Sequence, residues 1–382
     1  MRVLILTSAT GGGHNMRARS LQQWAARERP EWTVKIHEVL EGTHALYRFG
    51  VGVYNFIQRS SPRLHHFYFN WLEAAAMFRR HERILGRARF VALLEEVRPD
   101  VIVSVHGSTN HGFFDIARQV LGNVRCVTYC AEMHGGYGMS RHWVNPEADL
   151  FIGSLPETDD AARVLGMPPE KLRVGGFLLN PRFYDDRDDP AVRAASEHFW
   201  RDELRLDPAR FTLLLSTGAN SVNDHTRFLH ALRGFDLPIQ VVALCGSCKK
   251  TRLEVLEFAD RPDAARLTVR ALPTTDRMAL LMRGASAIVA RPGSGTTNEA
   301  IQSGCPLIFN QLRGLMPQEM ITERFCRKHG LAVSVRKPQE LAALLHAWVA
   351  DPSLPAAMAA RMADLRPKTS PIDILAMLEA AA

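Results

Sequence analysis

Short apolar runs rich in β-branched residues alternate with longer amphipathic stretches along most of the chain. In the first half these runs predict strands, because they are short and bounded by turn residues. The predicted strands lie at 3–8, 33–39, 101–105, 124–129, 149–153 and 172–176. Amphipathic patterns predict helices between them, at 14–29, 83–97 and 111–121. Strands that alternate with helices indicate βαβ units and therefore a parallel sheet.

The same alternation begins again after a break. Residues 180–193, NPRFYDDRDDPAVR, lack a periodic apolar pattern and are rich in Pro, Asp and Arg, which is typical of a linker. A second series of strands is predicted at 211–218, 239–246, 266–272, 286–290, 306–310 and 331–335. The pattern predicts an α/β protein of two doubly wound, Rossmann-like domains that face each other across a ligand-binding cleft.

The domain boundaries follow from the same pattern. We expect a first domain at 1–176, a linker at 177–205 and a second domain at 206–365. A proline-containing break then precedes a final helix, so we expect residues 366–382 to return to the first domain. A chain of 382 residues is long enough for two domains, each with its own core.

The composition, 46% hydrophobic and 23% charged, is that of a globular protein rather than a disordered one. The apolar start, Val3 to Leu6, is far shorter than a signal-peptide core, and no run approaches the roughly 20 apolar residues of a membrane helix. We therefore expect a cytoplasmic protein. The cysteines lie mostly in or beside apolar runs, so we expect reduced thiols and no disulfide framework.

Two short motifs have the spacing of metal or redox sites. Cys245-Gly-Ser-Cys248 has redox spacing, but it follows a strand deep in the chain, and a zinc site would need a second close ligand pair. Asp186-Arg-Asp188 matches a metal-binding D-x-D motif, but it lies in the linker, where solvation explains the charges. We therefore expect no bound metal.

The segment 48–91 is both basic and aromatic. It holds eight Arg and no Lys against two Glu, and nine aromatic residues lie from Tyr47, just before it, to Phe78. Arginines among aromatics on amphipathic helices suit an anionic membrane surface. Aromatics in the core with a solvated arginine face are an equally good interpretation. Nucleic acid is not the expected partner, because the chain contains no recognised nucleic-acid motif.

The stretch TSATGGGH places three glycines and His14 directly after the first strand. Consecutive glycines before a helix leave backbone N–H groups accessible to an anion or a close polar ligand. His14 would be the first helical side chain facing the cleft, where it could take a proton from an acceptor hydroxyl. A simple turn with a capping histidine explains this stretch equally well.

Two loops of the second half have a similar form. LLLSTGANS, 213–221, is a weak example, and SAIVARPGSGTTNEAIQSGCPLIF, 286–309, is a stronger one. In the stronger one we expect Thr296 and Thr297 to start a helix with Glu299 in its first turn. Backbone N–H groups and threonine hydroxyls suit a diphosphate, and the carboxylate suits two ribose hydroxyls. An ordinary capped helix is the alternative.

Taken together, these segments resemble the diacylglycerol glycosyltransferase and monogalactosyldiacylglycerol synthase family, relatives of the peptidoglycan lipid-linked N-acetylglucosaminyltransferase. The resemblance extends over nearly the whole chain and rests on the order and spacing of several segments. They are TGGGH, PDVIVSVHGS (99–108), RHWVNPEADLFIG (141–153), VGGF (174–177), VVALCGSCKKTRL (241–253), RPGSGTTNEAIQSGCPLI and MPQEM (316–320). The resemblance implies a GT-B fold of the glycosyltransferase family 28 type.

The resemblance also implies an activity: transfer of a hexose from a UDP-sugar to a lipid hydroxyl, with inversion and without metal or cofactor, at the inner face of the cell membrane. It implies a first domain on the acceptor and membrane side, with His14 as favoured base, Glu132 as weaker candidate, and an acceptor-side loop of Gly11, Gly12, Gly13 and His106. For the nucleotide sugar it implies a second-domain site of Gly218, Asn220, Gly246, Arg291, Gly293, Ser294, Gly295, Thr296, Thr297, Glu299, Gln318 and Glu319.

The chain departs from the family pattern at several donor positions. The usual KPGG is Arg291-Pro-Gly-Ser294, and the usual CGRN is Cys245-Gly-Ser-Cys248. In the stretch where relatives carry a Thr-Asp pair, this chain has the sequence TYCAE, from Thr128 to Glu132. Four alternatives therefore stay open. They are a transferase for a lipid-linked cell-wall or lipopolysaccharide precursor, one for a small-molecule acceptor, a sugar epimerase, and an inactive nucleotide-sugar sensor.

Overall fold

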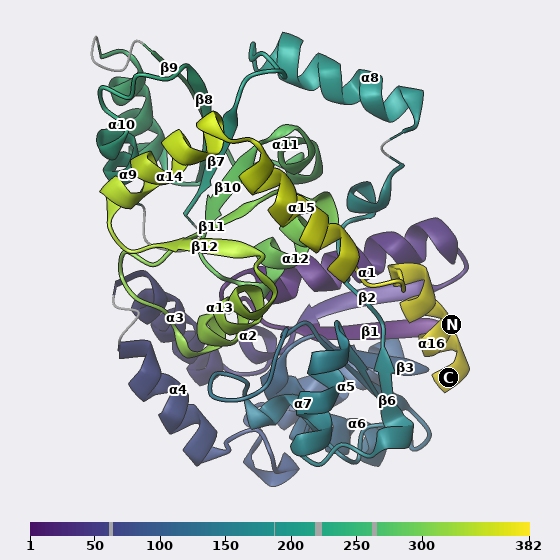
Figure 1. Cartoon of the computed structure of the whole chain (residues 1–382). Coiled ribbons are helices and arrows are strands. Elements are labelled where there is room, and N and C mark those ends of the chain that lie inside the picture. The colour runs from purple at the N-terminus through teal and green to yellow at the C-terminus, as the bar shows by residue number, and fades with distance from the viewer. Residues whose placement is uncertain (61–63, 187, 218–223, 262–265) are drawn as a thin grey trace. The chain divides into compact units, whose positions relative to one another are not determined.

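The chain folds into two compact units in the computed structural model (Figure 1), which describes residues 1–60, 64–186, 188–217, 224–261 and 266–382. The first unit comprises Met1–Pro181, Met316–Thr322 and Pro367–Ala382, and the second comprises Arg182–Leu315 and Glu323–Arg366. The first unit therefore also contains two segments from the second half of the sequence, one of them the C-terminal segment.

The first unit is built on a six-stranded, fully parallel sheet of order β2-β1-β3-β4-β5-β6. Its strands are β1 (Arg2–Thr7), β2 (Thr33–Glu38), β3 (Val101–Ser104), β4 (Arg125–Cys130), β5 (Leu150–Gly153) and β6 (Leu172–Val174). In the register of the central strands, Ile5 lies opposite Ile36 on one side and Val103 on the other. Strands β1, β3 and β5 are apolar and almost entirely buried because helices cover both sides of the sheet, whereas the edge strand β2 is partly exposed.

Helices cover this sheet and extend one connection. They are α1 (Gly13–Glu28), α2 (Val39–Thr43), α3 (Ala45–Ser60), α4 (Leu64–Ala75), α5 (Arg87–Val97), α6 (Gly112–Leu121), α7 (Pro156–Val164) and α16 (Pro371–Ala381). Short 3₁₀ turns lie at η1 (His81–Arg83), η2 (Gly107–Thr109), η3 (Arg141–Trp143) and η4 (Pro169–Lys171). A plain βαβ unit needs only one helix between β2 and β3, so α2 to α4 form an insertion.

The C-terminal helix α16 lies beside α1 in the first unit (Figure 1). Arg29, directly after α1, forms an ion pair with Glu379 of α16 at 2.7 Å. Within the same unit, the indole N–H of Trp24 in α1 donates to the carbonyl oxygen of Leu179 at 2.8 Å. The end of the sequence thus packs against the first helix of the chain.

The second unit has its own six-stranded parallel sheet, of order β12-β11-β10-β7-β8-β9. Its strands are β7 (Thr212–Ser216), β8 (Ile239–Gly246), β9 (Leu267–Pro273), β10 (Ala287–Ala290), β11 (Leu307–Asn310) and β12 (Ala332–Val335). Its helices are α9 (His225–Ala231), α10 (Lys249–Ala259), α11 (Met278–Gly284), α12 (Ser294–Ser303), α14 (Pro338–Ala350) and α15 (Ser353–Leu365). Helix α13 (Pro317–His329) begins in the first unit and ends in the second.

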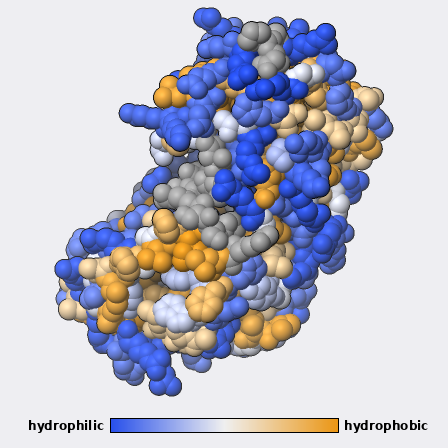
Figure 2. All heavy atoms as spheres, turned by 90° about the vertical axis from the view of Figure 1, so that its left-hand side faces the viewer, coloured by the Kyte–Doolittle hydropathy of each residue, from blue (hydrophilic) through white to orange (hydrophobic). Residues whose placement is uncertain are grey.

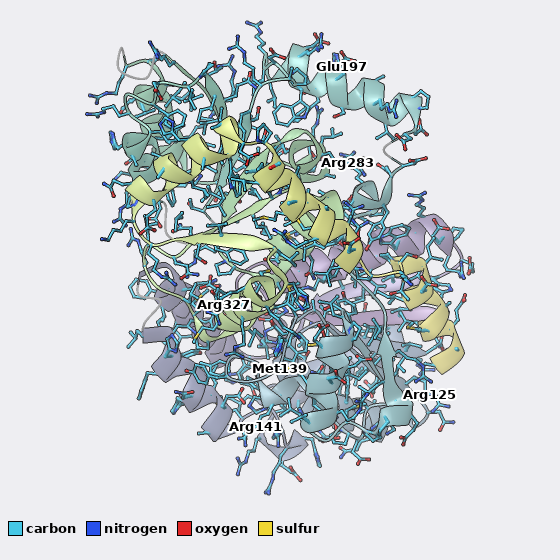
Figure 3. All side chains as sticks on the ribbon, in the orientation of Figure 1. Arg125, Met139, Arg141, Glu197, Arg283 and Arg327 are labelled. Atoms are coloured by element: carbon cyan, nitrogen blue, oxygen red, sulfur yellow. The ribbon has the colours of Figure 1, made fainter. Side chains whose placement is uncertain are left out.

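Both sheets confirm the predicted fold, since every predicted strand forms within two residues of its expected ends. The expected linker is more structured than its composition indicated. It contains η5 (Pro181–Tyr184), helix α8 (Pro190–His198) and a π-helical turn, η6 (Phe199–Glu203). Asp189 caps α8 by accepting from the N–H of Ala191 at 2.7 Å, and Arg283, labelled in Figure 3, donates to the carbonyl oxygen of Asp185 at 3.0 Å.

Candidate functional site

The first unit contains a cavity of about 410 Å³. Its walls come from α3, α4 and the segments that follow β1, β3 and β4. Most of the lining is apolar, for example Leu40, Val51, Phe69, Leu72, Phe78 and Trp143. A cavity of this size and lining suits an apolar ligand with a small polar part.

Polar side chains gather among the cavity-lining residues at the carboxyl ends of the strands. Thr10 and His14 follow β1, His106 follows β3, Glu132 follows β4, and Gln318 comes from the start of α13. In a parallel sheet these strand ends share one edge, which is where ligands bind in doubly wound folds. The fold therefore brings together His14, His106 and Glu132, which are far apart in the sequence. We call this group, with Thr10 and Gln318, the polar end of the cavity.

Hydrogen bonds set the tautomers of both histidines. The backbone carbonyl of Val105 can only accept, so Nδ1 of His14, at 2.8 Å, carries the proton and Nε2 keeps a lone pair. In His106, Nδ1 accepts from the N–H of Ser108 at 3.1 Å, so Nε2–H donates to the hydroxyl of Thr10 at 2.8 Å. The two rings meet edge to face with centroids 4.4 Å apart. His14 is thus held as a neutral imidazole with an available lone pair.

Burial governs the charge at the polar end. It lowers the pKa of His14 well below its usual range, with His106 and Arg17 adding to the effect. Burial likewise lowers the pKa of His106 to about 4. For Glu132 burial raises the pKa to about 7, although Arg17 acts in the opposite direction. Near neutral pH both histidines are therefore uncharged, and Glu132 exchanges its proton.

The triple-glycine loop, Ala9 to Gly13, differs from its expected use. The N–H of Ala9 donates to Glu41 at 2.8 Å, and the N–H of Gly11 donates to Asn55 of α3 at 3.1 Å. Asn55 also donates to the carbonyl oxygen of Ala9 at 3.1 Å. A side chain thus uses the amide of Gly11, one of the glycine amides that we expected an external ligand to occupy. Gly11 and Gly12 are needed because their φ angles, 70° and 81°, are left-handed.

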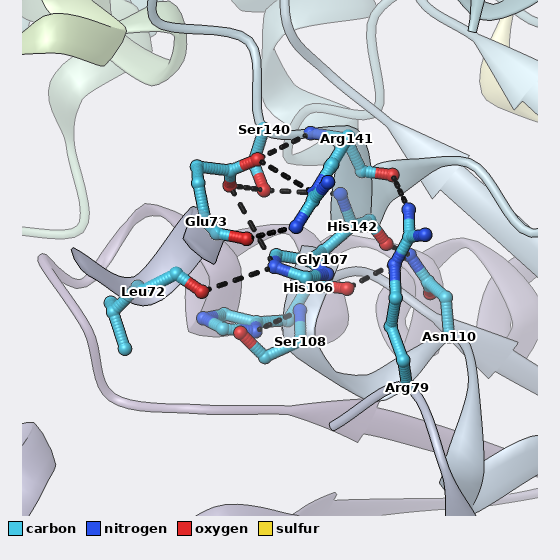
Figure 4. A network of polar contacts seen from close by, with 10 residues as sticks. All are labelled: Leu72, Glu73, Arg79, His106, Gly107, Ser108, Asn110, Ser140, Arg141 and His142. Carbon is cyan, nitrogen blue, oxygen red and sulfur yellow. Dashed lines mark hydrogen bonds and ion pairs between the residues drawn. The ribbon is translucent and has the colours of Figure 1, made fainter. Parts of the chain in front are cut away.

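A polar network joins α4 to the segment that carries η3 (Figure 4). Glu73 of α4 accepts from the hydroxyl of Ser140 and from the N–H of Arg141, the latter at 3.1 Å. Arg79 donates to the carbonyl oxygen of Arg141 at 3.4 Å, and Asn110 donates to that of His142 at 3.1 Å. The network fixes α4, and with it one wall of the cavity, to the body of the first unit.

Gln318 and Glu319 lie in the first unit rather than in the second domain where we expected the donor site. Gln318 donates to the hydroxyl of Tyr54 of α3 at 2.9 Å. Glu319 accepts from the N–H of Met316 at 2.9 Å. Sequence reasoning did not single out Tyr54 or Asn55. Their position in an amphipathic helix gave no signal of a polar role.

The glycine-rich turn of the second unit leads into α12. The helix begins at Ser294 rather than at Thr296, so Glu299 lies in the second turn and not in the first. Both Thr297 and Glu299 are buried, whereas Thr296 is partly exposed. A Cβ atom at Gly293 or Gly295 would meet no atom within 4 Å, which leaves the backbone open to approach.

The other expected donor residues are less fully defined. Arg291 is buried and donates to the carbonyl oxygen of Gly314 at 2.8 Å. Gly246 ends β8 with a left-handed φ of 58°. Gly218 and Asn220 lie outside the described residues.

The structure describes both motifs that have the spacing of a metal or redox site, at Cys245–Cys248 and at Asp186 and Asp188. Cys245 is buried and Cys248 is exposed, and all six cysteines are free thiols. Asp186 and Asp188 are exposed, and Asp188 pairs with Arg193. Within the described ranges, no group of three or more His, Cys, Asp or Glu is arranged to hold a metal ion.

Hydrophobic side chains are exposed on α3 and α4. Figure 2 views the molecule from the side on which these helices lie in Figure 1, and it shows hydrophobic side chains gathered in its lower half. We call the following residues the aromatic patch: Leu46, Phe49, Phe56, Leu64, Phe67 and Trp71. Phe67 is 74% exposed, which a core role does not explain. Among the described helices, none combines the length and apolar character needed to cross a bilayer.

Two family models match the chain. The model for monogalactosyldiacylglycerol (MGDG) synthase matches residues 14–178, and that for the glycosyltransferase family 28 C-terminal domain matches residues 215–318. The processive diacylglycerol β-glucosyltransferase of Staphylococcus carnosus is 22% identical over 96% of this chain and 89% of its own. The probable chloroplastic monogalactosyldiacylglycerol synthase 3 of Oryza sativa subsp. japonica is 24% identical over 91% and 67%, respectively.

Solved structures share the fold. MurG of Acinetobacter baumannii superposes with a TM-score of 0.62 at 14% identity, covering 99% of both chains. HepE of Anabaena, solved with UDP and glucose, superposes with a TM-score of 0.57 at 14% identity, covering 100% of both. Similarity at this level of identity concerns the fold alone.

Proposed function

Because the chain belongs to the diacylglycerol glycosyltransferase and monogalactosyldiacylglycerol synthase family, with a C-terminal domain of the glycosyltransferase family 28 type, we propose that it transfers a hexose from a UDP-sugar to the free hydroxyl of diacylglycerol. The observation that carries the proposal is the cavity of the first unit, whose apolar walls end in a group of polar side chains that includes two possible proton acceptors, His14 and Glu132. Apolar walls suit acyl chains, and the polar end suits a hydroxyl.

The polar end has the groups that a direct displacement requires. The hydroxyl of the acceptor must lose its proton as the new glycosidic bond forms at the anomeric carbon and the bond to UDP breaks. His14 offers the Nε2 lone pair as a hydrogen-bond acceptor, and Glu132 has a pKa of about 7. A base is most effective when its pKa is near the working pH, so in our proposal His14 orients the hydroxyl and Glu132 ends with the proton.

For the donor, the proposed site is the start of α12. Departure of UDP concentrates negative charge on its diphosphate, and the N–H groups of a helix start stabilise such charge without a metal. The open backbone at Gly293 and Gly295 leaves room for phosphate oxygens, and Thr296 is accessible there. Because Glu299 is buried in the second turn, its proposed contact with ribose requires the nucleoside to reach beyond the helix start.

The proposed acceptor is a membrane lipid, so the protein must reach a membrane surface. The aromatic patch lies on α3 and α4, the same helices that line the cavity. Arg80, Arg83, Arg87 and Arg89 are exposed in the segment that follows. Exposed aromatics that enter the interface, flanked by arginines that attract anionic headgroups, support peripheral binding to the inner face of the cell membrane.

A transfer assay tests the proposal. Purified protein is incubated with UDP-glucose or UDP-galactose and with anionic vesicles that contain diacylglycerol, with and without EDTA. We expect a glycosyl diacylglycerol of inverted anomeric configuration, equally with EDTA. Glu299→Ala should weaken UDP binding, and Glu257→Gln on the exposed face of α10 is its control. UDP-sugar that binds tightly but remains intact would contradict the proposal and favour a sensor.

A further inference from the structure

A buried histidine in the cavity wall has no hydrogen-bond partner among the other described residues. His65 of α4 is only 1% exposed and lines the cavity, and neither Nδ1 nor Nε2 forms a well-directed hydrogen bond with another described residue. The polar group that does approach the ring is the backbone of His65 itself. Burial lowers its pKa to about 4, so the ring is neutral and carries one N–H donor and one lone pair at neutral pH. Buried polar groups without partners are rare in native proteins and need an explanation.

Contacts with aromatic rings do not account for both nitrogens. The His65 ring meets Tyr54 edge to face, with centroids 4.8 Å apart, and lies 6.1 Å from the ring of Tyr68. An N–H group directed at an aromatic face is a weak, second-order interaction, and it would occupy only one ring nitrogen. The ring N–H of His65 therefore has no strong acceptor among the other described residues, and it can donate to a carbonyl of whatever fills the cavity.

The position of His65 relates it to the polar end. Tyr54 lies between the two: its ring contacts His65, and its hydroxyl accepts from Gln318 at 2.9 Å. Burial raises the pKa of Tyr54, and the charges of Glu132 and Glu319 add to this effect. The ring of Tyr54 therefore connects His65 to Gln318, one member of the polar end.

We propose that His65 donates a hydrogen bond to an ester carbonyl of the acceptor lipid inside the cavity, and that this bond selects diacylglycerol over lipids without an ester beside the free hydroxyl. This inference rests on the proposed function and names the feature by which the acceptor is recognised. Diacylglycerol carries an ester on the carbon next to its free hydroxyl, so a polar group near the polar end can meet it. A lipid with an ether-linked or isoprenoid chain offers no carbonyl there, so it leaves His65 unpaired at a free-energy cost.

The test compares dioleoylglycerol with its dialkyl ether analogue, which has the same hydroxyl and chain length but no carbonyl. We expect the wild-type kcat/KM for the diacyl lipid to be about tenfold higher, the effect of one buried hydrogen bond. His65→Phe keeps the ring but removes the donor, so activity on the diacyl lipid should fall to that on the ether. His65→Gln, which retains an N–H donor, should keep part of the preference.

The matched control is His66→Phe, the same substitution at the next residue, which is not part of the cavity lining. This variant should keep the wild-type preference. Equal wild-type kcat/KM for both lipids, or an equal loss on both in His65→Phe, would overturn the inference.

A binding measurement separates this inference from the proposed function. Thermal stabilisation by each lipid in detergent micelles needs no transfer reaction. If the wild type transfers sugar to neither lipid but is stabilised by the diacyl lipid alone, and His65→Phe loses this stabilisation, the inference stands and the proposed function fails. If neither lipid is transferred and neither stabilises the protein, both are wrong.

Discussion

Replacing Glu132 by glutamine tests the electrostatics of the polar end directly. The carboxylate is buried, and burial raises its pKa from 4.5 to about 7. Between these values the folded chain holds a proton that the unfolded chain has released, so the free energy of unfolding decreases as pH rises through this window. The gap corresponds to about 3 kcal/mol of destabilisation once the pH is well above 7. Glutamine has no charge and removes this contribution.

The expected result is a difference that depends on pH. At pH 8.5 Glu132→Gln should gain about 3 kcal/mol relative to the wild type, and at pH 5 it should gain about 1 kcal/mol or less from this source. Because two units can unfold separately, the readout should be local. Urea-dependent hydrogen exchange of amides in β4, Arg125–Cys130, reports on the first unit. Any effect of the glutamine side chain itself on the unfolding free energy is the same at both pH values, because glutamine does not titrate, so it cancels when the two differences are compared.

The control is Glu95→Gln, because Glu95 is exposed on α5 of the same unit. It should show the same unfolding free energy as the wild type at both pH values. A stability difference between Glu132→Gln and wild type that is constant from pH 5 to pH 8.5 would refute the reasoning. The same variant also tests the base: wild-type kcat/KM should rise with pH to a plateau above about 7, and the variant should lose this limb. A wild-type profile that is already flat above pH 6.5 would instead favour His14 as the proton acceptor.

Three further changes have defined outcomes. Gly138→Ala should lower the unfolding free energy of the first unit by more than about 2 kcal/mol, as measured by urea-dependent hydrogen exchange. The reason is that a Cβ atom at this position would lie 1.9 Å from the carbonyl oxygen of Pro317, in a residue whose φ is 106°. Asn55→Ala removes two hydrogen bonds to the triple-glycine loop and should lower kcat about tenfold, with little change in the KM for UDP-sugar. Phe49→Ser and Phe67→Ser should each weaken binding to anionic vesicles in a flotation assay about tenfold.

Matched variants separate these effects from general damage. Gly122→Ala also has a left-handed φ, 73°, but its Cβ would meet no atom within 4 Å, so it should cost much less stability than Gly138→Ala. Gln119→Ala, at an exposed position of α6 that is not part of the cavity lining, should not affect kcat. Val164→Ser removes an apolar side chain that is 87% exposed outside the aromatic patch, and it should leave vesicle binding unchanged. If a test variant and its matched control show the same change in stability, kcat or vesicle binding, the corresponding prediction is contradicted.

The strand pattern could be read from the sequence because parallel strands covered on both faces are continuous apolar runs. Val101–Ser104 and Ala287–Ala290 are examples, each entirely buried. Helix starts were harder to place. Helix α12 begins two residues before its expected start because backbone geometry at Gly293, rather than the threonines, sets the cap. In the linker, the charged run concealed α8, which Asp189 caps.

The sequence by itself determined the two α/β units and the position of the glycine loop and of His14 after the first strand, because these depend on local periodicity and on residues adjacent in the chain. The family resemblance added Glu132 and His106 as candidates. Only the tertiary structure decided that Asn55 accepts from the amide of Gly11, that Gln318 reaches the cavity of the first unit, and that His65 is buried without a hydrogen bond to any other residue that the structure describes. Burial and contacts between distant segments set hydrogen bonding and pKa, and no local pattern encodes them.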